Sequence, residues 1–326
     1  MDETDEVLSP MQLTVVTEKP EWDRIIHSFP FWDVAHEWGY FQAYRARQRE
    51  CSSRQVLLYL ERDGNRIAYP FFLKERQEGE YVLEAVYGYT GALFTGTDFD
   101  GSWANFQGEV KRFCVENDIV AVSEKFHPLL QNQYPILPES KPELRRQVVL
   151  LRTRSGDDLL ANYRRKNVRK RVRQAREKGI VVTTGGAEGI EEALTLYRQT
   201  MRRNQAEDIY YFEKGFFEAF FAELPGRCTF FFARLGQELA AMTLALHSPH
   251  CVYLFVGGMA SEYRDYHPNY LLQHEMLEHF HAMGVPYVND GGGRTSDPDD
   301  SLLIFKRGFT KEEPVDYYVG STPVSH

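Results

Sequence analysis

The sequence contains no long hydrophobic run. None of its apolar stretches approaches the roughly 20 residues with which a helix crosses a bilayer, although 43% of the residues are hydrophobic. The N-terminal segment MDETDEVLSP is acidic and lacks the pattern of a secretory signal peptide. We therefore expect a cytoplasmic protein with no transmembrane segment.

Cysteine is scarce, and no Cys-x-x-Cys pair occurs. The four cysteines are scattered along the chain, at Cys51, Cys114, Cys228 and Cys251. Buried, reduced thiols are the simplest interpretation of this spacing.

Several catalytic motifs are also missing. There is no Gly-x-Ser-x-Gly sequence, which disfavours a serine hydrolase, and no Gly-x-Gly-x-x-Gly sequence, which disfavours a dinucleotide-binding fold. His274-Glu275 and Glu278-His279 lie close together, but their spacing matches neither HExxH nor HxxEH. We therefore expect no bound metal.

Positive charge is concentrated in one place. The whole chain has a formal net charge of −9. Residues 164–178, RRKNVRKRVRQAREK, hold nine Lys or Arg residues and one acidic residue, Glu177, so this segment carries +8. A run of one sign on an acidic protein indicates a polyanionic partner, such as RNA, a pyrophosphate or a coenzyme phosphate. The alternative is a solvated helix face without a partner.

The same segment has the pattern of a helix. Ser155 is a suitable N-cap, and Asp157 and Asp158 would lie in the first turn, where carboxylates favour the helix dipole. Gly179 predicts the C-terminal end, and the β-branched run 180–184 predicts a strand. An apolar stripe recurs at helical spacing, at Ala161, Val168, Val172 and Ala175.

The length of 326 residues leaves room for two domains. The polar stretch 132–146 contains three prolines and predicts a linker. An internal repeat supports the division. Residues 57–73, LLYLERDGNRIAYPFFL, and 230–246, FFFARLGQELAAMTLAL, each predict two strands joined by a tight turn, at Gly64 and Gly236.

Similar elements surround the two hairpins. Helical patterns precede each hairpin, and a further helix and strand follow it. We expect helices at 32–47, 189–204, 213–223, about 102–116 and about 269–283, and strands at 119–123 and 286–290. The sequence therefore predicts an α/β fold with two domains of one plan, each a mixed sheet flanked by helices. The strand 315–319 has no place in the second half, and we expect it to return to the first domain.

A glycine-rich loop and a pair of cations follow the strand at 286–290. Glycines 291–293 allow the backbone to approach a ligand or to adopt positive φ. A plain flexible turn is the alternative. Shortly afterwards Phe305 precedes Lys306 and Arg307. Two cations beside an aromatic ring could hold an oxyanion or phosphate, or could be ordinary surface charges.

Arginine and tyrosine occur together in the stretch 200–212, TMRRNQAEDIYYF. Arg203 and Tyr211 suit a polar, extended acceptor, although aromatic residues packed at a helix end explain the same pattern. Tyr253 is expected on an apolar strand, where a buried core tyrosine is the simpler interpretation.

Taken together, these segments resemble the Fem family of aminoacyltransferases. The matching stretches keep the family order over most of the chain: YGYTGALF at 87–94, FHPLLQN at 126–132, RKNVRKRVRQAREKGI from 165, TMRRNQAEDIYYF from 200, PNYLL from 268, and GGG followed by DSLLIFKRGF at 300–309. The resemblance implies two tandem acyltransferase domains of the GNAT type. They would span residues 1–145 and 146–311, with the tail 312–326 completing the first.

The resemblance also implies a reaction. Fem enzymes form the peptide bonds of peptidoglycan bridges by transferring an amino acid from aminoacyl-tRNA to a primary amine. By resemblance, Lys306 is the cation that stabilises the tetrahedral oxyanion, with Phe305 beside it. Arg203, Tyr211 and Tyr253 would bind the acceptor, a peptide or muropeptide that carries an amine. No cofactor is implied beyond aminoacyl-tRNA as co-substrate, and a lipid-linked acceptor would bring the protein to a membrane surface.

The basic segment would then hold the tRNA. Its expected contacts are with backbone phosphates, which are independent of sequence and sensitive to salt. The residues expected to make them are Arg164, Arg165, Lys166, Arg169, Lys170 and Arg173.

The chain departs from the family pattern in two places. No heptad segment provides the coiled-coil arm of some Fem proteins, so this chain resembles the arm-free type. His127-Pro128 stands where many members have Asp-Pro. A histidine can act as a base near neutral pH or serve the structure alone, and His127 is the candidate base.

Two other functions stay open at this point. A GNAT-type enzyme that uses acyl-CoA would cradle the pyrophosphate with [QR]-x-x-G-x-[GA] at the start of a helix, and the sequence has no such element. An RNA-binding module built on residues 164–178 would leave Lys306 and the glycine loop without a role, and the acidic net charge fits it poorly.

Overall fold

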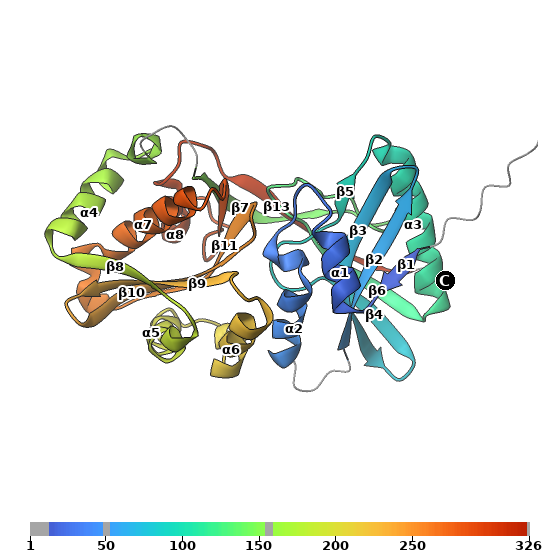
Figure 1. Ribbon diagram of the computed structural model, residues 1–326, viewed down its shortest axis with the longest axis horizontal. Coiled ribbons are helices and arrows are strands. Elements are labelled where there is room, and N and C mark those ends of the chain that lie inside the picture. The colour runs from blue at the N-terminus through green and yellow to red at the C-terminus, as the bar shows by residue number, and fades with distance from the viewer. Residues whose placement is uncertain (1–12, 48–52, 154–158, 325–326) are drawn as a thin grey trace, which may run out of the picture.

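Strands from both halves of the chain join into one continuous sheet (Figure 1). The computed structural model describes residues 13–47, 53–153 and 159–324. Within them the strands are β1 (Thr14–Val16), β2 (Ser53–Arg62), β3 (Asn65–Gln77), β4 (Glu80–Glu84), β5 (Leu93–Thr95), β6 (Ile119–Lys125), β7 (Glu143–Arg152), β8 (Ile180–Gly185), β9 (Cys228–Leu235), β10 (Glu238–His247), β11 (Cys251–Met259), β12 (Tyr287–Gly291) and β13 (Val315–Pro323). They pair in the order β1-β2-β3-β4-β6-β13-β7-β12-β11-β10-β9-β8, and β5 pairs with β3.

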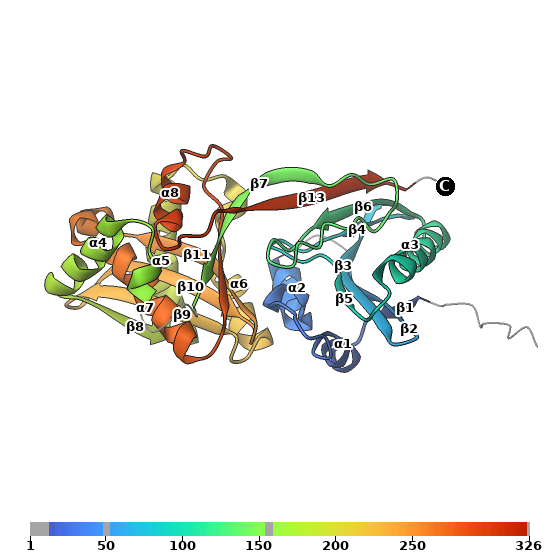
Figure 2. The same ribbon diagram turned by 90° about the horizontal axis from the view of Figure 1, so that it is seen from above.

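Helices cover both faces of this sheet. In the first half they are α1 (Lys19–Ile26), the 3-10 turn η1 (Val34–His36), α2 (Trp38–Arg47) and α3 (Phe99–Glu116). In the second half they are η2 (Leu159–Asn162), α4 (Lys166–Glu177), η3 (Ala187–Gly189), α5 (Ile190–Arg203), η4 (Asp208–Tyr210), α6 (Lys214–Glu223), η5 (Ser261–Tyr266), α7 (Pro268–Ala282) and α8 (Ser301–Arg307). Helices α4, α7 and α8 pack on one face of the second half, and α5 and α6 pack on the other (Figures 1 and 2).

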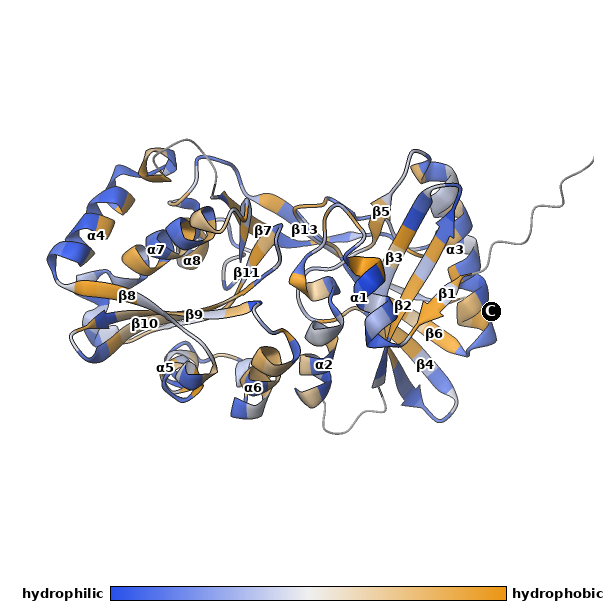
Figure 3. Cartoon of the chain, in the orientation of Figure 1, coloured by the Kyte–Doolittle hydropathy of each residue, from blue (hydrophilic) through white to orange (hydrophobic). Residues whose placement is uncertain are grey.

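Three hydrophobic clusters hold these layers together. One packs α3 against the strands of the first half, and a second packs α4, α7 and α8 against those of the second half. The third runs between the halves and includes residues of α1, α2, α5, α6 and both hairpins. Figure 3 shows the apolar residues along the strands and a largely polar surface on α4. Because one cluster spans both halves, the halves are packed against each other and not merely tethered.

Helices α2 and α6 meet at this interface. A Cβ on Gly39 would lie 2.0 Å from the carbonyl oxygen of Glu223, so the two backbones touch at a position that only glycine allows. Nearby, Glu37 is 6% exposed and lies 3.4 Å from the guanidinium of Arg227. The guanidinium of Arg47 lies 4.7 Å from the ring centre of Phe212. Backbone contact, an ion pair and a cation–π contact thus fix the two halves relative to one another.

The predicted hairpins are confirmed. β2 and β3 pair antiparallel around Asp63 and Gly64, whose φ angles of 51° and 78° are those of a type I′ turn. β9 and β10 pair in the same way around Gly236, with φ of 60°. The strands at 119–123 and 286–290 and four of the expected helices are present, with ends shifted by a few residues at most. The helix expected at 32–47 is divided into the 3-10 turn η1 and the helix α2, which starts only at Trp38.

The prediction of a linker at 132–146 is wrong. β7 begins within it, at Glu143. Ile136 and Leu137 are fully buried, and the backbone N–H of Ile136 donates to the carboxylate of Glu124 at 2.9 Å. The prolines therefore shape a packed turn of the first half instead of a free connection.

The basic helix begins later than the sequence suggested. α4 starts at Lys166, and Arg165 occupies the N-cap position without a side-chain cap. Ser155, Asp157 and Asp158 lie outside the described residues. At the other end the prediction is confirmed, because Gly179 has φ of 86° and β8 follows directly.

The last strand, β13, lies between the two halves (Figure 2). It pairs antiparallel with β6, with Val319 opposite Lys125, and with β7, with Val315 opposite Val148. β7 pairs on its other side with β12. The division of the chain into domains at residues 145 and 311 stays a prediction, since one sheet runs through both halves. Among helices in the described ranges, none has the length and apolar character of a membrane span.

Candidate functional site

The parallel strands β11 and β12 diverge in the middle of the second half. Residues 251–253 pair with 287–289, and the pairing ends there, while β11 continues beside β10 to Met259. β12 ends at Gly291, with φ of 72°. The carboxyl end of a parallel strand pair that opens in this way is a common ligand-binding place in α/β sheets, because its backbone groups are free to bind.

Lys306 reaches this point from α8. Asp300 caps α8 by accepting hydrogen bonds from two backbone N–H groups of the first turn, at 2.9 and 3.1 Å. The Nζ of Lys306 donates to the carbonyl oxygen of Asp290 and, at 2.9 Å, to that of Gly292. Its side chain is 13% exposed. The ammonium group is thus fixed at the end of β12.

A buried carboxyl and a buried amide lie beside this ammonium group. Oδ1 of Asp290 is 3.6 Å from the Nζ of Lys306, and Oδ2 accepts a hydrogen bond from Gln273 on α7 at 3.0 Å. Burial raises the pKa of Asp290 to about 6, against the lowering effect of Lys306. The Nδ2 of Asn289 is buried and has no partner within the described part of the chain.

Tyrosines from separate segments converge on the same place. The hydroxyl of Tyr89 lies 3.4 Å from the position that a Cβ would take on Gly291, and the Nζ of Lys306 lies 3.7 Å from that position. The ring of Tyr89 packs edge-on against Tyr253 and Tyr317, with ring centres 5.3 and 4.8 Å away. Burial raises the pKa of all three tyrosines, so their hydroxyls stay protonated.

Arg146 supports the glycine loop from β7. Its Nη1 donates to the carbonyl oxygen of Gly293 at 3.2 Å, and a Cβ on Gly292 would lie 2.8 Å from its Cδ. The centre therefore combines two cations, a carboxyl and neutral hydroxyl donors around a glycine backbone. Such a set can stabilise negative charge that develops on a reacting oxygen.

The structure brings together some of the predicted site residues. Tyr253 lies at the Lys306 centre, because its ring packs against that of Tyr89. The ring of Phe305 packs against Tyr270 and Phe309, with ring centres 4.9 and 5.2 Å away. Phe305 thus helps to seat α8 on α7.

Arg203 and Tyr211 lie elsewhere along α5 and its following loop. The Nη1 of Arg203 donates to the carbonyl oxygen of Met259 at 2.9 Å, and the backbone N–H of Tyr211 donates to Asp208 at 3.0 Å. Within the described residues, neither side chain contacts Lys306. Their role at an acceptor site stays a prediction.

His127 is completely buried. Its Nε2 lies 2.9 Å from the carboxylate of Asp33, and its backbone N–H donates to Asn132 at 2.6 Å. A side chain without exposed surface cannot reach a substrate in this conformation. The geometry therefore gives no support to His127 as a base.

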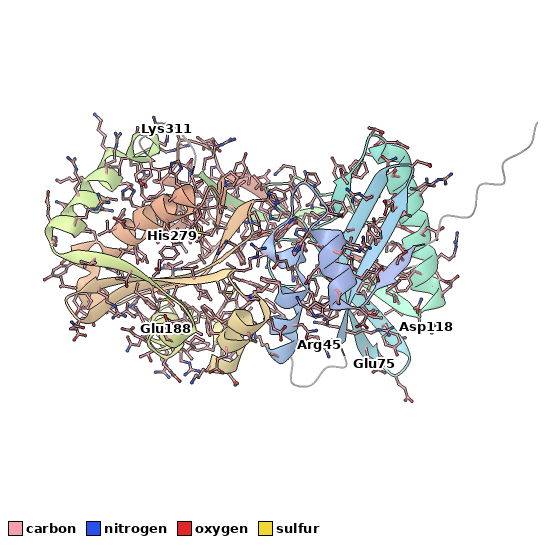
Figure 4. All side chains as sticks on the ribbon, viewed as in Figure 1. Arg45, Glu75, Asp118, Glu188, His279 and Lys311 are labelled. Carbon is pink, nitrogen blue, oxygen red and sulfur yellow. The ribbon has the colours of Figure 1, made fainter. Side chains whose placement is uncertain are left out.

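Some cations of the basic segment are used inside the chain. Arg164 binds the loop that follows α8: it donates to the carbonyl oxygens of residues 310–312 and to the carboxylate of Glu313 at 2.6 Å. Lys311, labelled in Figure 4, belongs to this loop. Arg171 stacks on Tyr270 at 4.8 Å, and Arg176 pairs with Glu275 at 2.7 Å. Lys178 donates to the carbonyl oxygen of Asp265.

The remaining cations form what we call the free basic face of α4. Within the described parts of the chain, no acceptor contacts their charged ends. They are Arg165, Lys166, Arg169, Lys170 and Arg173. The helix that carries them adjoins α8, since a Cβ on Gly308 would lie 2.8 Å from Cγ2 of Val168. The free basic face and Lys306 therefore belong to neighbouring helices.

Two surface pockets lie away from Lys306. One, of about 270 Å³, is lined mostly by apolar and aromatic side chains of the first half, including Phe31, Phe99 and Trp103. The other, of about 600 Å³, lies along β7 and β13. Among the residues that the structure describes, no cluster of three or more His, Cys, Asp or Glu could hold a metal ion.

The sequence alone did not single out Tyr89, Asp290 or Arg146. Tyr89 and Asp290 lie within or beside stretches that carry the Fem resemblance, but nothing in their spacing separates them from their neighbours. Arg146 fell in the expected linker. Only the contact of three distant segments around Gly291 identifies them.

Comparisons with known proteins agree with this architecture. Residues 162–299 match a family model described as an acetyltransferase (GNAT) domain. The crystal structure of FemX is similar over 94% of this chain and 96% of that one, with 15% identity and a TM-score of 0.71. None of the curated proteins compared with the chain matches it in sequence.

Two further structures share the arrangement. A tandem GNAT protein from the clavulanic acid biosynthesis pathway is similar over 97% of this chain and 99% of that one, with 13% identity and a TM-score of 0.51. The C-terminal domain of a putative lysylphosphatidylglycerol synthetase from Agrobacterium fabrum is similar over 88% and 93%, with 11% identity and a TM-score of 0.52. The fold is thus a mixed α/β fold of the tandem GNAT type, and the matches support an acyltransferase enzyme.

Proposed function

We propose that the protein transfers an amino acid from aminoacyl-tRNA to a primary amine of a peptide-containing acceptor and so forms a peptide bond. One observation carries the proposal. Lys306 lies where β11 and β12 diverge, on a helix that packs against the apolar side of α4, the helix whose other side carries the free basic face. An aminoacyl-tRNA carries an ester, which would react at Lys306, and a phosphate backbone, which would bind the free basic face.

The reaction is the aminolysis of an ester. The amine nitrogen attacks the carbonyl carbon, and the π electron pair of the carbonyl moves to its oxygen. When the tetrahedral intermediate collapses, the bond to the ribose oxygen breaks, and that oxygen takes up the proton that the amine loses. Because the ester is already activated, the protein needs only to align the reactants and stabilise the oxyanion.

Lys306 supplies the positive charge for this oxyanion. Capping by Asp300 and the bonds to Asp290 and Gly292 hold it in place before the substrate arrives. Preorganised charge of this kind lowers a barrier because little reorganisation is needed during the reaction. The loss of one such contact costs on the order of 3 kcal/mol.

The free basic face would hold the tRNA backbone. Its five cations have no partners of their own in the described chain, so binding phosphates would not break existing pairs. Arg164 has a different task, since it fixes the loop after α8.

The acceptor is the less defined substrate. The shared fold with FemX agrees with a muropeptide, and a peptide natural product carries the same amine chemistry. Tyr253 is the candidate acceptor residue that lies next to the Lys306 centre, through Tyr89. A lipid-linked acceptor would place the enzyme at a membrane surface during turnover.

Acyl-CoA is the second candidate donor. The match of residues 162–299 to an acetyltransferase model favours it. An enzyme that uses acyl-CoA would bind the pyrophosphate through backbone N–H groups at the start of a helix. The segment before α7 argues against this donor, because residues 261–266 form the 3-10 helix η5 and contain no glycine that would expose such groups.

The test supplies the purified protein with labelled aminoacyl-tRNA or labelled acyl-CoA, together with a panel of peptide and muropeptide amines. We expect incorporation from aminoacyl-tRNA only. Incorporation from acyl-CoA alone would replace the proposed donor, and incorporation without any added amine would exclude the proposed acceptor class.

A further inference from the structure

The loop 87–92 is clamped by side chains at five of its six carbonyl groups. The hydroxyls of Tyr40 and Tyr317 donate to the carbonyl oxygens of residues 87 and 88, at 2.8 and 3.4 Å. The amide of Asn132 donates to those of residues 90 and 92, at 3.1 and 2.9 Å, and His36 bonds that of residue 91 at 3.3 Å. Residues 88–92 are buried, so their carbonyl groups need partners inside the protein, and here side chains from distant segments supply them.

The two anchors His36 and Asn132 are themselves fixed from behind. Nδ1 of His36 accepts a hydrogen bond from the backbone N–H of Asp33 at 3.1 Å, so Nε2 carries the hydrogen that is donated to Gly91. Burial lowers the pKa of His36 to about 4, which keeps this neutral donor form near neutral pH. Asn132 is oriented by the backbone N–H of His127, at 2.6 Å.

The conformation of the loop depends on one glycine. Gly91 has φ of 74°, and a Cβ there would lie 2.3 Å from Nδ2 of Asn132. His127 and Asp33 pair through their side chains, and their backbone N–H groups bond the two anchors, so this buried pair supports the clamp on the loop.

The side chain that this loop presents is Tyr89. Its ring is held between Tyr253 and Tyr317, and its hydroxyl faces Gly291, beside the ammonium group of Lys306. In the described part of the chain, this hydroxyl has no hydrogen-bond acceptor. A rigid loop thus holds an uncommitted donor at the centre where β11 and β12 diverge.

Lys306, in contrast, is already engaged. An ammonium group has three N–H donors. Two of them bond the carbonyl oxygens of Asp290 and Gly292, and the carboxylate of Asp290 lies 3.6 Å away. One N–H of Lys306 is left for a substrate, and the carboxylate of Asp290 competes for it, whereas the hydroxyl of Tyr89 has no competing acceptor in the described part of the chain.

We infer that Tyr89 is a catalytic residue that donates a hydrogen bond to the carbonyl oxygen of the transferred acyl group, and that His36 and Asn132 are positioning residues that hold its loop. This inference rests on the proposed function and adds a second, neutral donor to the charge of Lys306. The bond strengthens as the carbonyl π pair moves to oxygen and the amine–carbon bond forms. No proton leaves Tyr89: the amine proton ends on the ribose oxygen when the ester bond breaks.

The first test compares Tyr89→Phe with the wild type. The variant keeps the ring and its packing and loses only the hydroxyl. We expect kcat to fall on the order of 100-fold, with the KM of donor and acceptor within about twofold and an unchanged melting temperature. Tyr134→Phe is the control, because the Tyr134 side chain is 46% exposed in the first half. A wild-type kcat for Tyr89→Phe, or a rise confined to KM, would overturn the catalytic role.

The second test addresses the positioning residues. Asn132→Asp removes both donors to the loop and keeps the oxygen that accepts from His127. We expect a lower kcat in the wild-type background and a much smaller further loss in the Tyr89→Phe background, because the two changes act through one hydroxyl. Equal losses in both backgrounds would show that Asn132 acts independently of Tyr89.

These outcomes are separate from the fate of the proposed donor. If acyl-CoA proves to be the donor, both tests are run with acyl-CoA, and Tyr89 keeps or loses its role on the same criteria. A failure of the tRNA assay therefore leaves the question of Tyr89 intact, and a normal Tyr89→Phe variant leaves the donor assignment intact.

Discussion

The carboxylate of Asp290 lies 3.6 Å from the ammonium group of Lys306, and Asp290 is 5% exposed while the Lys306 side chain is 13% exposed. The carboxyl belongs to the end of a strand and the ammonium to a short helix, so their pairing links β12 to α8. Burial works against the charged form of Asp290, and Lys306 favours it. Burial prevails, since the pKa of Asp290 is raised to about 6.

This relationship predicts a pH-dependent stability. The unfolded chain releases the Asp290 proton near pH 4, whereas the folded protein holds it until about pH 6. Stability from this group is therefore present at low pH and is lost as pH rises from about 4 to 6. Relative to the wild type, Asp290→Asn should gain on the order of 3 kcal/mol in free energy of unfolding over this interval. Urea unfolding of both proteins at pH 4 to 7 measures the difference.

The expected difference curve rises between pH 4 and 6 and is flat above pH 7. A flat curve throughout would mean that the two states bind the proton equally, and a falling curve would mean that the pair with Lys306 outweighs burial.

Removal of the Lys306 ammonium should abolish most of the turnover. Lys306→Ala loses the positive charge at the developing oxyanion, and kcat should fall on the order of 100-fold or more. Lys311→Ala, which removes a nearby exposed cation, is the matched control. Steady-state kinetics with circular dichroism of both variants provides the measurement. Normal turnover in a folded Lys306→Ala protein would remove Lys306 from the mechanism.

The free basic face should control the salt dependence of donor binding. Charge reversal of Arg165, Lys166 and Arg169 removes three cations that have no partner in the described chain. The slope of log affinity for tRNA against log salt should flatten by about two to three units, since each lost phosphate contact contributes somewhat less than one unit. Filter binding at several salt concentrations measures the slope.

A control with the same change in charge separates local contacts from net charge. Reversal of Arg24, Arg54 and Arg76, three exposed arginines of the first half, should leave the slope close to that of the wild type. If both triple variants flatten the slope equally, the effect comes from overall charge and α4 is not the contact surface.

Gly39→Ala should weaken the interface between the halves. The new methyl group would overlap the carbonyl oxygen of Glu223, and α2 would have to move away from α6. We expect a loss of about 1–3 kcal/mol, as for other overpacked sites. Gly108→Ala is the matched control, because Gly108 is also helical and nothing lies within 4 Å of its missing Cβ. That change should stabilise the protein by about 1 kcal/mol, and a similar loss in both variants would contradict the overlap.

Local patterns predicted much of this fold. The turns at Gly64 and Gly236 were visible because positive φ favours glycine there. The apolar stripe of α4, Val168 and Val172, gave the helix its buried face. Lys306 was found through an aromatic and a cation after a glycine loop, and the Fem resemblance supplied its implied role.

Long-range contacts account for what the sequence did not predict. Five carbonyl groups of the loop 87–92 accept hydrogen bonds from segments before and after it in the chain, including the C-terminal strand. The periodicity of the sequence does not indicate such bonds, so nothing distinguished Tyr89 from the other aromatic residues. His127 appeared as a candidate base because its type suits that role, whereas its burial depends on packing by Phe31 and His36.

The position of β13 has a consequence for biosynthesis. β6 and β7 acquire their common neighbour only when residues 315–323 have emerged from the ribosome. Until then each strand has an open edge with which a strand of another chain can pair. The pairing with β13 also joins segments far apart in the sequence, which slows folding. The nascent protein is therefore exposed to aggregation at these two edges until β13 docks between them.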